Sequence, residues 1–309
     1  MPFRQLQVSG LPALALSNAE IECIVVPSLG GKITNLRRRR GREWLWRDPP
    51  RDFTDIPTDG SFPDTGGWDE CFPTIAPCPM PGAAPGEPDL PDHGELWSLP
   101  WTHDVLETPA ATVLTSRVEG RLLPYEFHRD IIVPTEGPAI RLEYRLVHRG
   151  LASFPFLWSA HPIFSAPAGM TVTLPSVRQM RVDHSQARPD LAPDAEVPWP
   201  LDGMAHSWTV PAVGGWSAKL FGDIGASGMA ILTDPTRGEQ LEIMVDPGVL
   251  PNVGLWIDAT ASLARLGVEP CLGAPDRLDR AVTEWRSAPV LEPGTTRNWA
   301  ITLRIPEFD

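Results

Sequence analysis

Ala139-Ile140-Arg141-Leu142-Glu143-Tyr144-Arg145-Leu146-Val147-His148 is the clearest strand signal in this sequence. The even positions from 140 to 146 carry apolar side chains, and the odd positions from 141 to 145 carry charged ones. Side chains of a β-strand point alternately to its two faces, so this pattern predicts a strand with one face in a core and the other in water.

Similar apolar or alternating runs recur along the chain, at Glu22–Val26, Lys32–Leu36, Thr112–Val118, Thr171–Leu174, Ser217–Phe221, Leu241–Val245, Gly254–Ile257 and Asn298–Ile305. The 36 prolines and 26 glycines among the 309 residues interrupt the chain so often that only Asp276–Trp285 shows a convincing helical spacing. Many short strands with almost no helix predict an all-β sandwich or barrel rather than an α/β fold. We find no internal repeat and no clear linker, so we expect one domain over residues 1–309.

Charge and cysteine usage exclude several classes of protein. The net charge of -13 argues against nucleic acid or an anionic membrane as the main partner, because both attract basic surfaces. No stretch approaches the ~18 apolar residues that would span a membrane, and the N-terminus lacks a signal-peptide pattern. The four cysteines show no metal-type spacing, which predicts reduced thiols in a cytoplasmic protein without a metal site.

Two proline-rich segments are candidates for a functional surface. Asp48–Pro100 is long, rich in Pro, Gly and Asp, and poor in strand signals, as functional loops often are. Its tryptophans argue against disorder, because such rings favour burial or a ligand. Asp183–Pro211 is also rich in proline, and we expect it to border the same site. The arginine run Arg37–Arg42 is interpreted instead as the solvated tip of a β-hairpin.

Three short segments carry the acid/base chemistry, namely Asp92-His93-Gly94, Ala160-His161-Pro162-Ile163-Phe164 and Gly267-Val268-Glu269-Pro270. His161 follows an apolar strand, where burial favours the neutral imidazole, although a satisfied core histidine would look the same. Glu269 has no adjacent cation, so it is either paired within the fold or exposed at a strand end. Two imidazoles and a carboxylate, if brought together, can move protons between two oxygens near neutral pH.

The order and context of these segments resemble the aldose 1-epimerase (galactose mutarotase-like) family. The most specific local match is His93-Gly94 followed by Ser98-Leu99-Pro100-Trp101. The resemblance implies a supersandwich of large antiparallel sheets and sugar ring opening without a metal or organic cofactor. It also implies that His161 is the general acid, that Glu269 is the general base, and that His93 binds a sugar hydroxyl or the ring oxygen.

The segment Thr65-Gly66-Gly67-Trp68-Asp69-Glu70 departs from the related hexose-6-phosphate mutarotases, which carry an arginine before the glycine pair. Ionised carboxylates only accept hydrogen bonds, so Asp69 and Glu70 suit hydroxyl groups better than phosphate. We therefore expect a neutral monosaccharide, held by His93, Trp68, Asp69, Glu70 and Trp97.

Two other functions remain compatible with the sequence. One is a non-catalytic carbohydrate-binding protein on the same fold, since a fold does not determine an activity. The other is a sugar lyase or hydrolase, and hydrolysis would need a pair of carboxylates such as Asp69 and Glu269. The sequence does not determine which sugar is bound or the oligomeric state.

Overall fold

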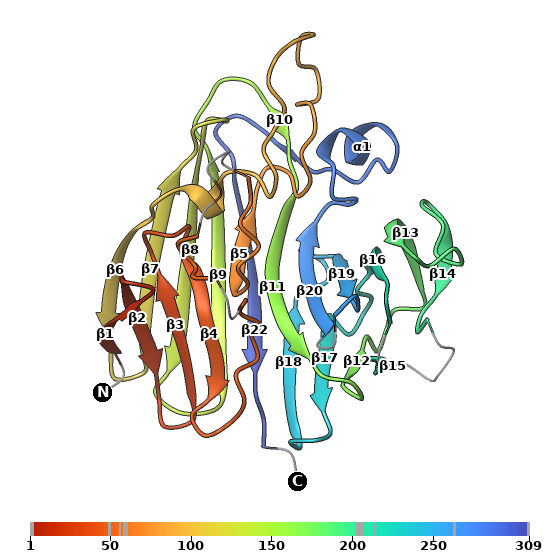
Figure 1. Cartoon of the computed structure of the whole chain (residues 1–309). Helices are drawn as coiled ribbons and strands as arrows, with labels where there is room; N and C mark the ends of the chain where they lie inside the picture. The colour runs from red at the N-terminus through yellow and green to blue at the C-terminus, as the bar shows by residue number, and fades with distance from the viewer. Residues whose placement is uncertain are drawn as a thin grey trace.

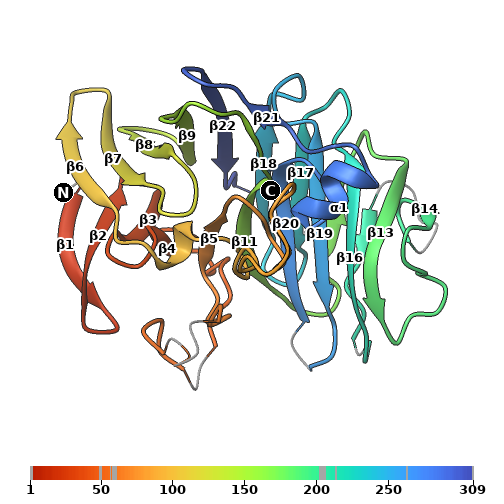
Figure 2. The ribbon, with the colours of Figure 1, turned by 90° about the horizontal axis from the view of Figure 1, so that it is seen from above.

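The computed structural model describes residues 3–48, 51–55, 57, 61–201, 207–212, 214–261 and 264–307. Two large antiparallel sheets make up most of this part of the chain and face each other as two layers (Figures 1 and 2). The larger sheet contains, in spatial order, β1 Phe3–Val8, β2 Leu11–Ser17, β3 Ile21–Val26, β4 Lys32–Arg38, β5 Trp68–Cys71, β11 Trp158–Ala166, β20 Ala264–Leu272, β19 Asn252–Asp258, β16 Ser217–Asp223, β13 Gln179–Gln186 and β14 Glu196–Pro198.

The second sheet lies behind the first in Figure 1 and closes the other side of the core. It contains, in spatial order, β15 Ser207–Thr209, β12 Thr171–Thr173, β17 Met229–Asp234, β18 Glu239–Val245, β22 Thr296–Arg304, β9 Ala139–His148, β8 Tyr125–Pro134, β7 Ala111–Glu119 and β6 Thr102–Glu107. The remaining elements are the small pair β10 Phe154–Pro155 and β21 Val290–Leu291, the 3₁₀ turn η1 Leu96–Ser98 and the helix α1 Leu278–Thr283. The predicted all-β class with large antiparallel sheets is confirmed.

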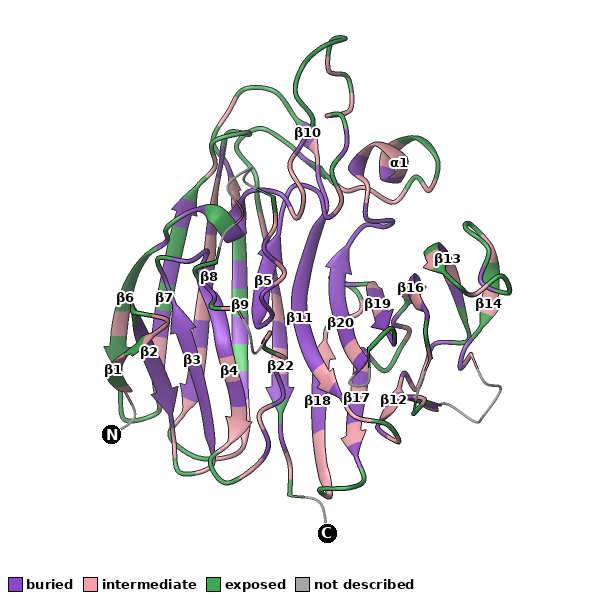
Figure 3. Ribbon diagram, viewed as in Figure 1, coloured by how far each residue is buried: buried purple, intermediate pink, exposed green. Residues whose placement is uncertain are grey.

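The two sheets differ in how many of their faces are buried. Strand β9 has the predicted bounds, and its apolar positions are buried while its charged positions face solvent (Figure 3). Strands β11 and β20, at the centre of the larger sheet, are buried on both faces instead. Their second face is covered by other parts of the chain, among them an apolar cluster that joins Cys71, Ile75 and Leu278. A buried outer face in the middle of a sheet is a place where polar side chains can meet away from water.

The expected helix at Asp276–Trp285 is present but shorter, as α1 Leu278–Thr283. The backbone carbonyl of Asp276 accepts hydrogen bonds from the amides of Ile75 and Ala76, so this residue is tied to the long loop and lies outside the helix. Within the described part of the chain, no helix has the length and apolar character needed to cross a membrane.

The predicted solvated hairpin tip is present at Arg39 and Arg40, which are exposed in the turn after β4, but it does not extend over the whole arginine run. Arg42 is buried, where it donates hydrogen bonds to the carboxylate of Asp234 (2.5 Å) and to the carbonyl of Ser165 (2.6 Å). Arg37 and Arg38 are paired with the nearby carboxylates of Glu22 and Glu20. Local composition could not reveal these partners, because Asp234 lies far along the chain and reaches Arg42 only through the packing of the sheets.

Candidate functional site

Strand register places the two proposed catalytic residues side by side. Strands β11 and β20 pair Ser159 with Cys271 and Ile163 with Gly267, so the same register sets His161 opposite Glu269. Residues directly opposite each other in a sheet point to the same face. His161 and Glu269 therefore share the outer face of the larger sheet.

A cavity of about 350 Å³ opens over this face. Its walls come from the loop Asp48–Pro100, from strands of the larger sheet and from Asp276, which precedes α1. The lining residues are Phe62, Asp64, Ile75, Ala76, Asp92, His93, His161, Ile163, His184, Lys219, Trp256 and Asp276. Both expected histidines are present, with ring centroids 4.7 Å apart. The Phe62 ring stacks on His93 at 3.7 Å and meets His161 edge-on at 5.8 Å.

His161 is only 7% exposed, and its Nδ1 is buried without a hydrogen-bond partner. Burial lowers the pKa of His161 well below its usual value, and the nearby His93, Lys219 and Lys32 lower it further. The ring is therefore neutral at pH 7, with a proton on one nitrogen and a lone pair on the other. Such a ring can donate one hydrogen bond and accept another.

The His93-Gly94 pair has a structural explanation. Gly94 passes so close to Phe72 that a side-chain carbon would lie 1.9 Å from the Phe72 carbonyl oxygen. His93 has a φ of 60°, a backbone conformation that non-glycine residues adopt at a cost, and its amide bonds the Ile75 carbonyl at 2.6 Å. The loop thus holds the His93 ring at the edge of the cavity.

The carboxylate of Asp92 accepts a hydrogen bond from Nδ1 of His93 at 3.0 Å. This bond leaves Nε2 as the acceptor nitrogen when the ring is neutral. Trp97, which we expected to touch the substrate, is buried and contacts Phe62 edge-on at 5.4 Å without lining the cavity.

Glu269 is fully buried next to the cavity, and its partner was not evident from the sequence. One oxygen, Oε2, accepts hydrogen bonds from the Lys219 ammonium and from the Ser159 hydroxyl (3.2 Å). The other oxygen, Oε1, has no hydrogen-bond partner. Gly267 makes room for it, since a side-chain carbon there would lie 2.3 Å from Oε1. The paired alternative for Glu269 is therefore the correct one.

Lys219 and Asp276 are the functional candidates that sequence reasoning missed. Lys219 lines the cavity, is buried, and lies between two carboxylates, with its Nζ 3.5 Å from Oδ1 of Asp276. Burial opposes its charge, but Asp276 and Glu269 outweigh that effect and raise the pKa of Lys219. Burial also raises the pKa of Asp276 to about 6. The one available signal was a lysine inside the apolar run Ser217–Phe221.

The Trp68-Asp69-Glu70 cluster is divided between the two faces of β5. Asp69 pairs with His161 across β5 and β11, faces the same side and forms an ion pair with Lys32. Trp68 and Glu70 point to the other face, into the core between the sheets. We therefore leave Trp68 and Glu70 out of the site, because a strand cannot present consecutive side chains to one cavity.

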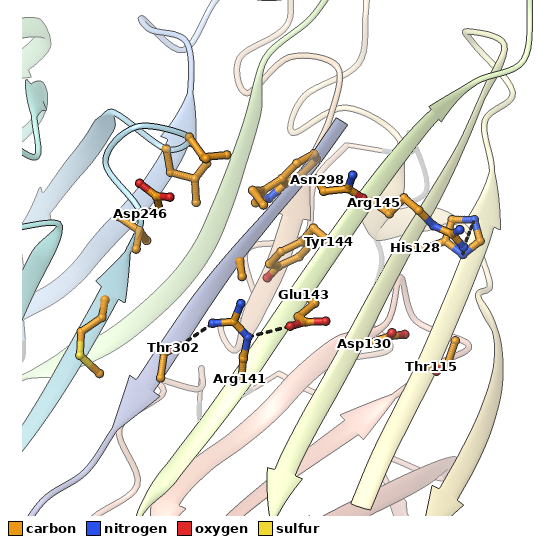
Figure 4. A pocket seen from close by; sticks show the side chains of 16 residues that line it. Thr115, His128, Asp130, Arg141, Glu143, Tyr144, Arg145, Asp246, Asn298 and Thr302 are labelled. Carbon is orange, nitrogen blue, oxygen red and sulfur yellow. Dashed lines mark hydrogen bonds and ion pairs between the residues drawn. The ribbon is translucent and has the colours of Figure 1, made fainter. Parts of the chain in front are cut away.

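A larger hollow of about 730 Å³ lies on the outer face of the second sheet (Figure 4). Several of its charged side chains are partnered with their neighbours: Arg141 bonds Glu143 at 2.7 Å, and Arg145 bonds His128 at 2.9 Å. Burial lowers the pKa of His128 in this hollow, but that ring is already paired with Glu126 and Arg145, so the smaller cavity is the better candidate site.

No protein-family model matches the chain, and no curated protein matches it by sequence. Solved structures do match it. The Slr1438 protein from Synechocystis sp. PCC 6803 is 19% identical with a TM-score of 0.75, over 98% of each chain. A candidate aldose 1-epimerase from Klebsiella pneumoniae is 13% identical with a TM-score of 0.78, over 98% of this chain and 83% of that one. A galactose mutarotase-like protein from Lactobacillus casei is 14% identical with a TM-score of 0.68, over 95% of this chain and 100% of that one. The chain therefore has the fold of the galactose mutarotase-like proteins.

Proposed function

We propose that this protein is an aldose 1-epimerase-like mutarotase that interconverts the α and β anomers of a neutral monosaccharide. One observation carries the proposal: His161 and Glu269 lie opposite each other on adjacent strands, and His161 lines a cavity together with His93, Lys219 and Asp276. Acid and base groups held at a fixed spacing next to a small polar cavity are what ring opening of a sugar needs.

In the proposed reaction, Glu269 accepts the proton of the anomeric hydroxyl through Oε1, the oxygen without a partner. The minor imidazolium form of His161 donates a proton to the ring oxygen and becomes the neutral imidazole, and the bond between C1 and that oxygen breaks. Rotation about the C1–C2 bond and closure with the proton transfers reversed give the other anomer. Lys219 keeps Glu269 oriented and stabilises its negative charge.

The second cavity carboxyl, Asp276, is proposed to accept hydrogen bonds from sugar hydroxyls. Its Oδ1 is buried and has no hydrogen-bond partner, so a hydroxyl would satisfy it. Nε2 of His93 would accept a hydrogen bond from another sugar hydroxyl. The rings of Phe62 and Trp256 supply apolar surface for the sugar ring. This mixture of a few polar groups with aromatic walls is typical of small-molecule sites.

The cavity suits an uncharged sugar better than a sugar phosphate. Lys219 is the only Lys or Arg that lines it among the described residues, and its charge is already compensated by Glu269 and Asp276. Binding phosphate there would place it beside carboxylates, which repel it. The four buried, unpaired cysteines suit a reducing cytoplasm, where we expect the protein to act.

Polarimetry tests the proposal directly. Freshly dissolved, anomerically pure glucose or galactose should reach its equilibrium rotation faster with the protein than with its His161→Asn variant. Saturable sugar binding without acceleration would instead establish the carbohydrate-binding alternative. Release of smaller sugars from an oligosaccharide would establish a lyase or hydrolase, and either result would overturn the mutarotase proposal.

A further inference from the structure

Three side chains that bind soft metals converge beside the cavity. They are Cys71, His93 and His161, each offering one sulfur or nitrogen atom, and these atoms all lie within 4.8 Å of one another. Cys71 is on β5 opposite Ser159 of β11, so it shares the face that carries His161 two residues further along. The proposed mutarotase chemistry makes no use of Cys71.

The two histidines are prepared for ligation as well as for sugar binding. His161 is 7% exposed, and its Nδ1 has no partner, so a lone pair or a proton there is unsatisfied. Nδ1 of His93 donates a hydrogen bond to the Asp92 carboxylate, which leaves the lone pair of Nε2 available to a ligand. Metal-bound histidines in proteins commonly have such a carboxylate on their other nitrogen, where it fixes the tautomer and the ring orientation.

We propose that Cys71, His93 and His161 form a binding site for Zn²⁺ that inhibits the enzyme. On binding, the Cys71 thiol loses its proton to solvent and forms a sulfur–zinc bond, while the two neutral imidazoles each supply a lone pair. Three protein ligands leave a fourth position of the tetrahedron open for water on the cavity side. The inhibition rests on the proposed function: an imidazole committed to zinc can no longer exchange a proton with the sugar.

The geometry is close to what zinc needs. Bonds of about 2.0–2.3 Å in a tetrahedron put ligand atoms roughly 3.5 Å apart, so small side-chain rotations close the present spacing. Thiolate and imidazole select zinc over magnesium or calcium, which prefer oxygen ligands.

A second group, Asp183, His184 and Asp276, offers mainly oxygen atoms but is less suited to a cation. Arg280 pairs with Asp183 at 2.8 Å, and Lys219 lies 3.5 Å from Asp276, so two protein cations already compensate these carboxylates. This contrast makes the cysteine-containing group the metal site.

Cobalt(II) is the probe for direct binding, because it reports a thiolate ligand by a charge-transfer band in the near ultraviolet. The wild-type protein should give this band with one equivalent of Co²⁺, and Zn²⁺ but not Mg²⁺ should abolish it. Cys71→Ser should lose the band, whereas Cys78→Ser, which changes another buried cysteine outside the group, should keep it.

Zinc affinity, measured by competition with a chromophoric chelator, gives a second readout. It should fall in Cys71→Ser by more than the roughly 10–100-fold that loss of an outer-shell partner costs. If Cys71→Ser does not fold, His93→Asn at the partly exposed position should show the same loss. A wild-type protein without the band, or a band that survives in Cys71→Ser, would refute the site.

The inhibition is tested by polarimetry with and without micromolar Zn²⁺. Wild type and Cys78→Ser should be inhibited, whereas Cys71→Ser should keep the metal-free rate and resist zinc. A cobalt band together with an undiminished rate in zinc would refute the inhibitory role. If the protein accelerates mutarotation under no condition, the proposed function fails, and the cobalt spectrum still decides the metal site.

Discussion

The buried carboxylates on the two faces of the larger sheet differ in how completely their oxygens are hydrogen-bonded. In the core, Glu70 accepts hydrogen bonds from Arg129 (2.9 Å), Tyr144 (3.1 Å) and Trp158 (3.1 Å). On the cavity face, Glu269 and Asp276 share Lys219, and each keeps an oxygen without a hydrogen-bond partner. Both environments are dry, yet only the core carboxylate has both oxygens bonded.

The difference separates a structural network from a functional one. Buried polar groups are normally hydrogen-bonded, and a fully bonded network makes a core rigid and specific. A buried oxygen left without a partner costs free energy, so its persistence is explained best where a ligand completes the bonding. The unsatisfied atoms of Glu269, Asp276 and His161 belong to the cavity region, whereas the core also holds unpartnered donors, among them Nε of Arg129. The following experiments test this division.

Removing either proposed proton-transfer group should have the largest effect. We expect His161→Asn and Glu269→Gln each to lower kcat by about 10²–10⁴-fold, the usual contribution of one positioned acid or base. Because the two act in one step, the double variant should lose far less than the product of the single losses. Mutarotation rates measure this, with Glu70→Gln as the control that keeps its rate. Full activity in Glu269→Gln would show that the base lies elsewhere.

Breaking the core network should destabilise the protein without changing its chemistry. Arg129→Met removes the cation from a fully buried pair, and we expect a loss of about 3–5 kcal/mol in the free energy of unfolding. The matched control is Arg141→Met in an exposed pair, worth at most about 1 kcal/mol. Urea unfolding measures both. A folded Arg129→Met protein that turns over slowly would contradict the separation of the two faces.

The pH dependence of the free energy of unfolding should report the protonation of Glu70 in the core. Burial raises the pKa of Glu70 to about 7, although Arg129 acts in the opposite direction. The folded state thus holds this proton more tightly than the unfolded one, whose pKa is near 4.5. The contribution of this bound proton to the free energy of unfolding is fully present below pH 4.5 and is lost as the pH rises to about 7. Glu70→Gln should therefore flatten the decline of unfolding free energy across this window, and an unchanged slope would contradict the assignment.

The smallest expected effect concerns Asp276 in the cavity. Burial raises its pKa to about 6, so a proposed acceptor for sugar hydroxyls becomes fully ionised only above that pH. We expect kcat/KM to rise with pH through about 6 in wild type, and this limb to disappear in Asp276→Asn. KM should change more than kcat if Asp276 only binds the sugar. A fall in kcat as large as that of Glu269→Gln would identify Asp276 as the base instead.

Much of the fold was predictable because neighbouring residues of a strand lie on opposite faces, so a half-buried strand alternates apolar and polar residues. Strand β9 was predicted with its exact bounds by alternation alone. The same rule does not work for β5, because Trp68, Asp69, Glu70 and Cys71 are all buried and no alternation of polarity marks either face. The sequence therefore grouped Trp68 and Glu70 with Asp69 as sugar-binding residues, whereas the fold places them in the core.

The sequence by itself determined the all-β class, most of the strands and, through a family resemblance, His93, His161 and Glu269 as candidates. Only the tertiary structure decided which groups share a cavity. Lys219 and Asp276 meet Glu269 through strand register and through a loop carbonyl bonded to distant amides. Hydrophobic periodicity is a local property that a single strand displays, but electrostatic partnership between buried groups depends on contacts between segments that are far apart in the chain.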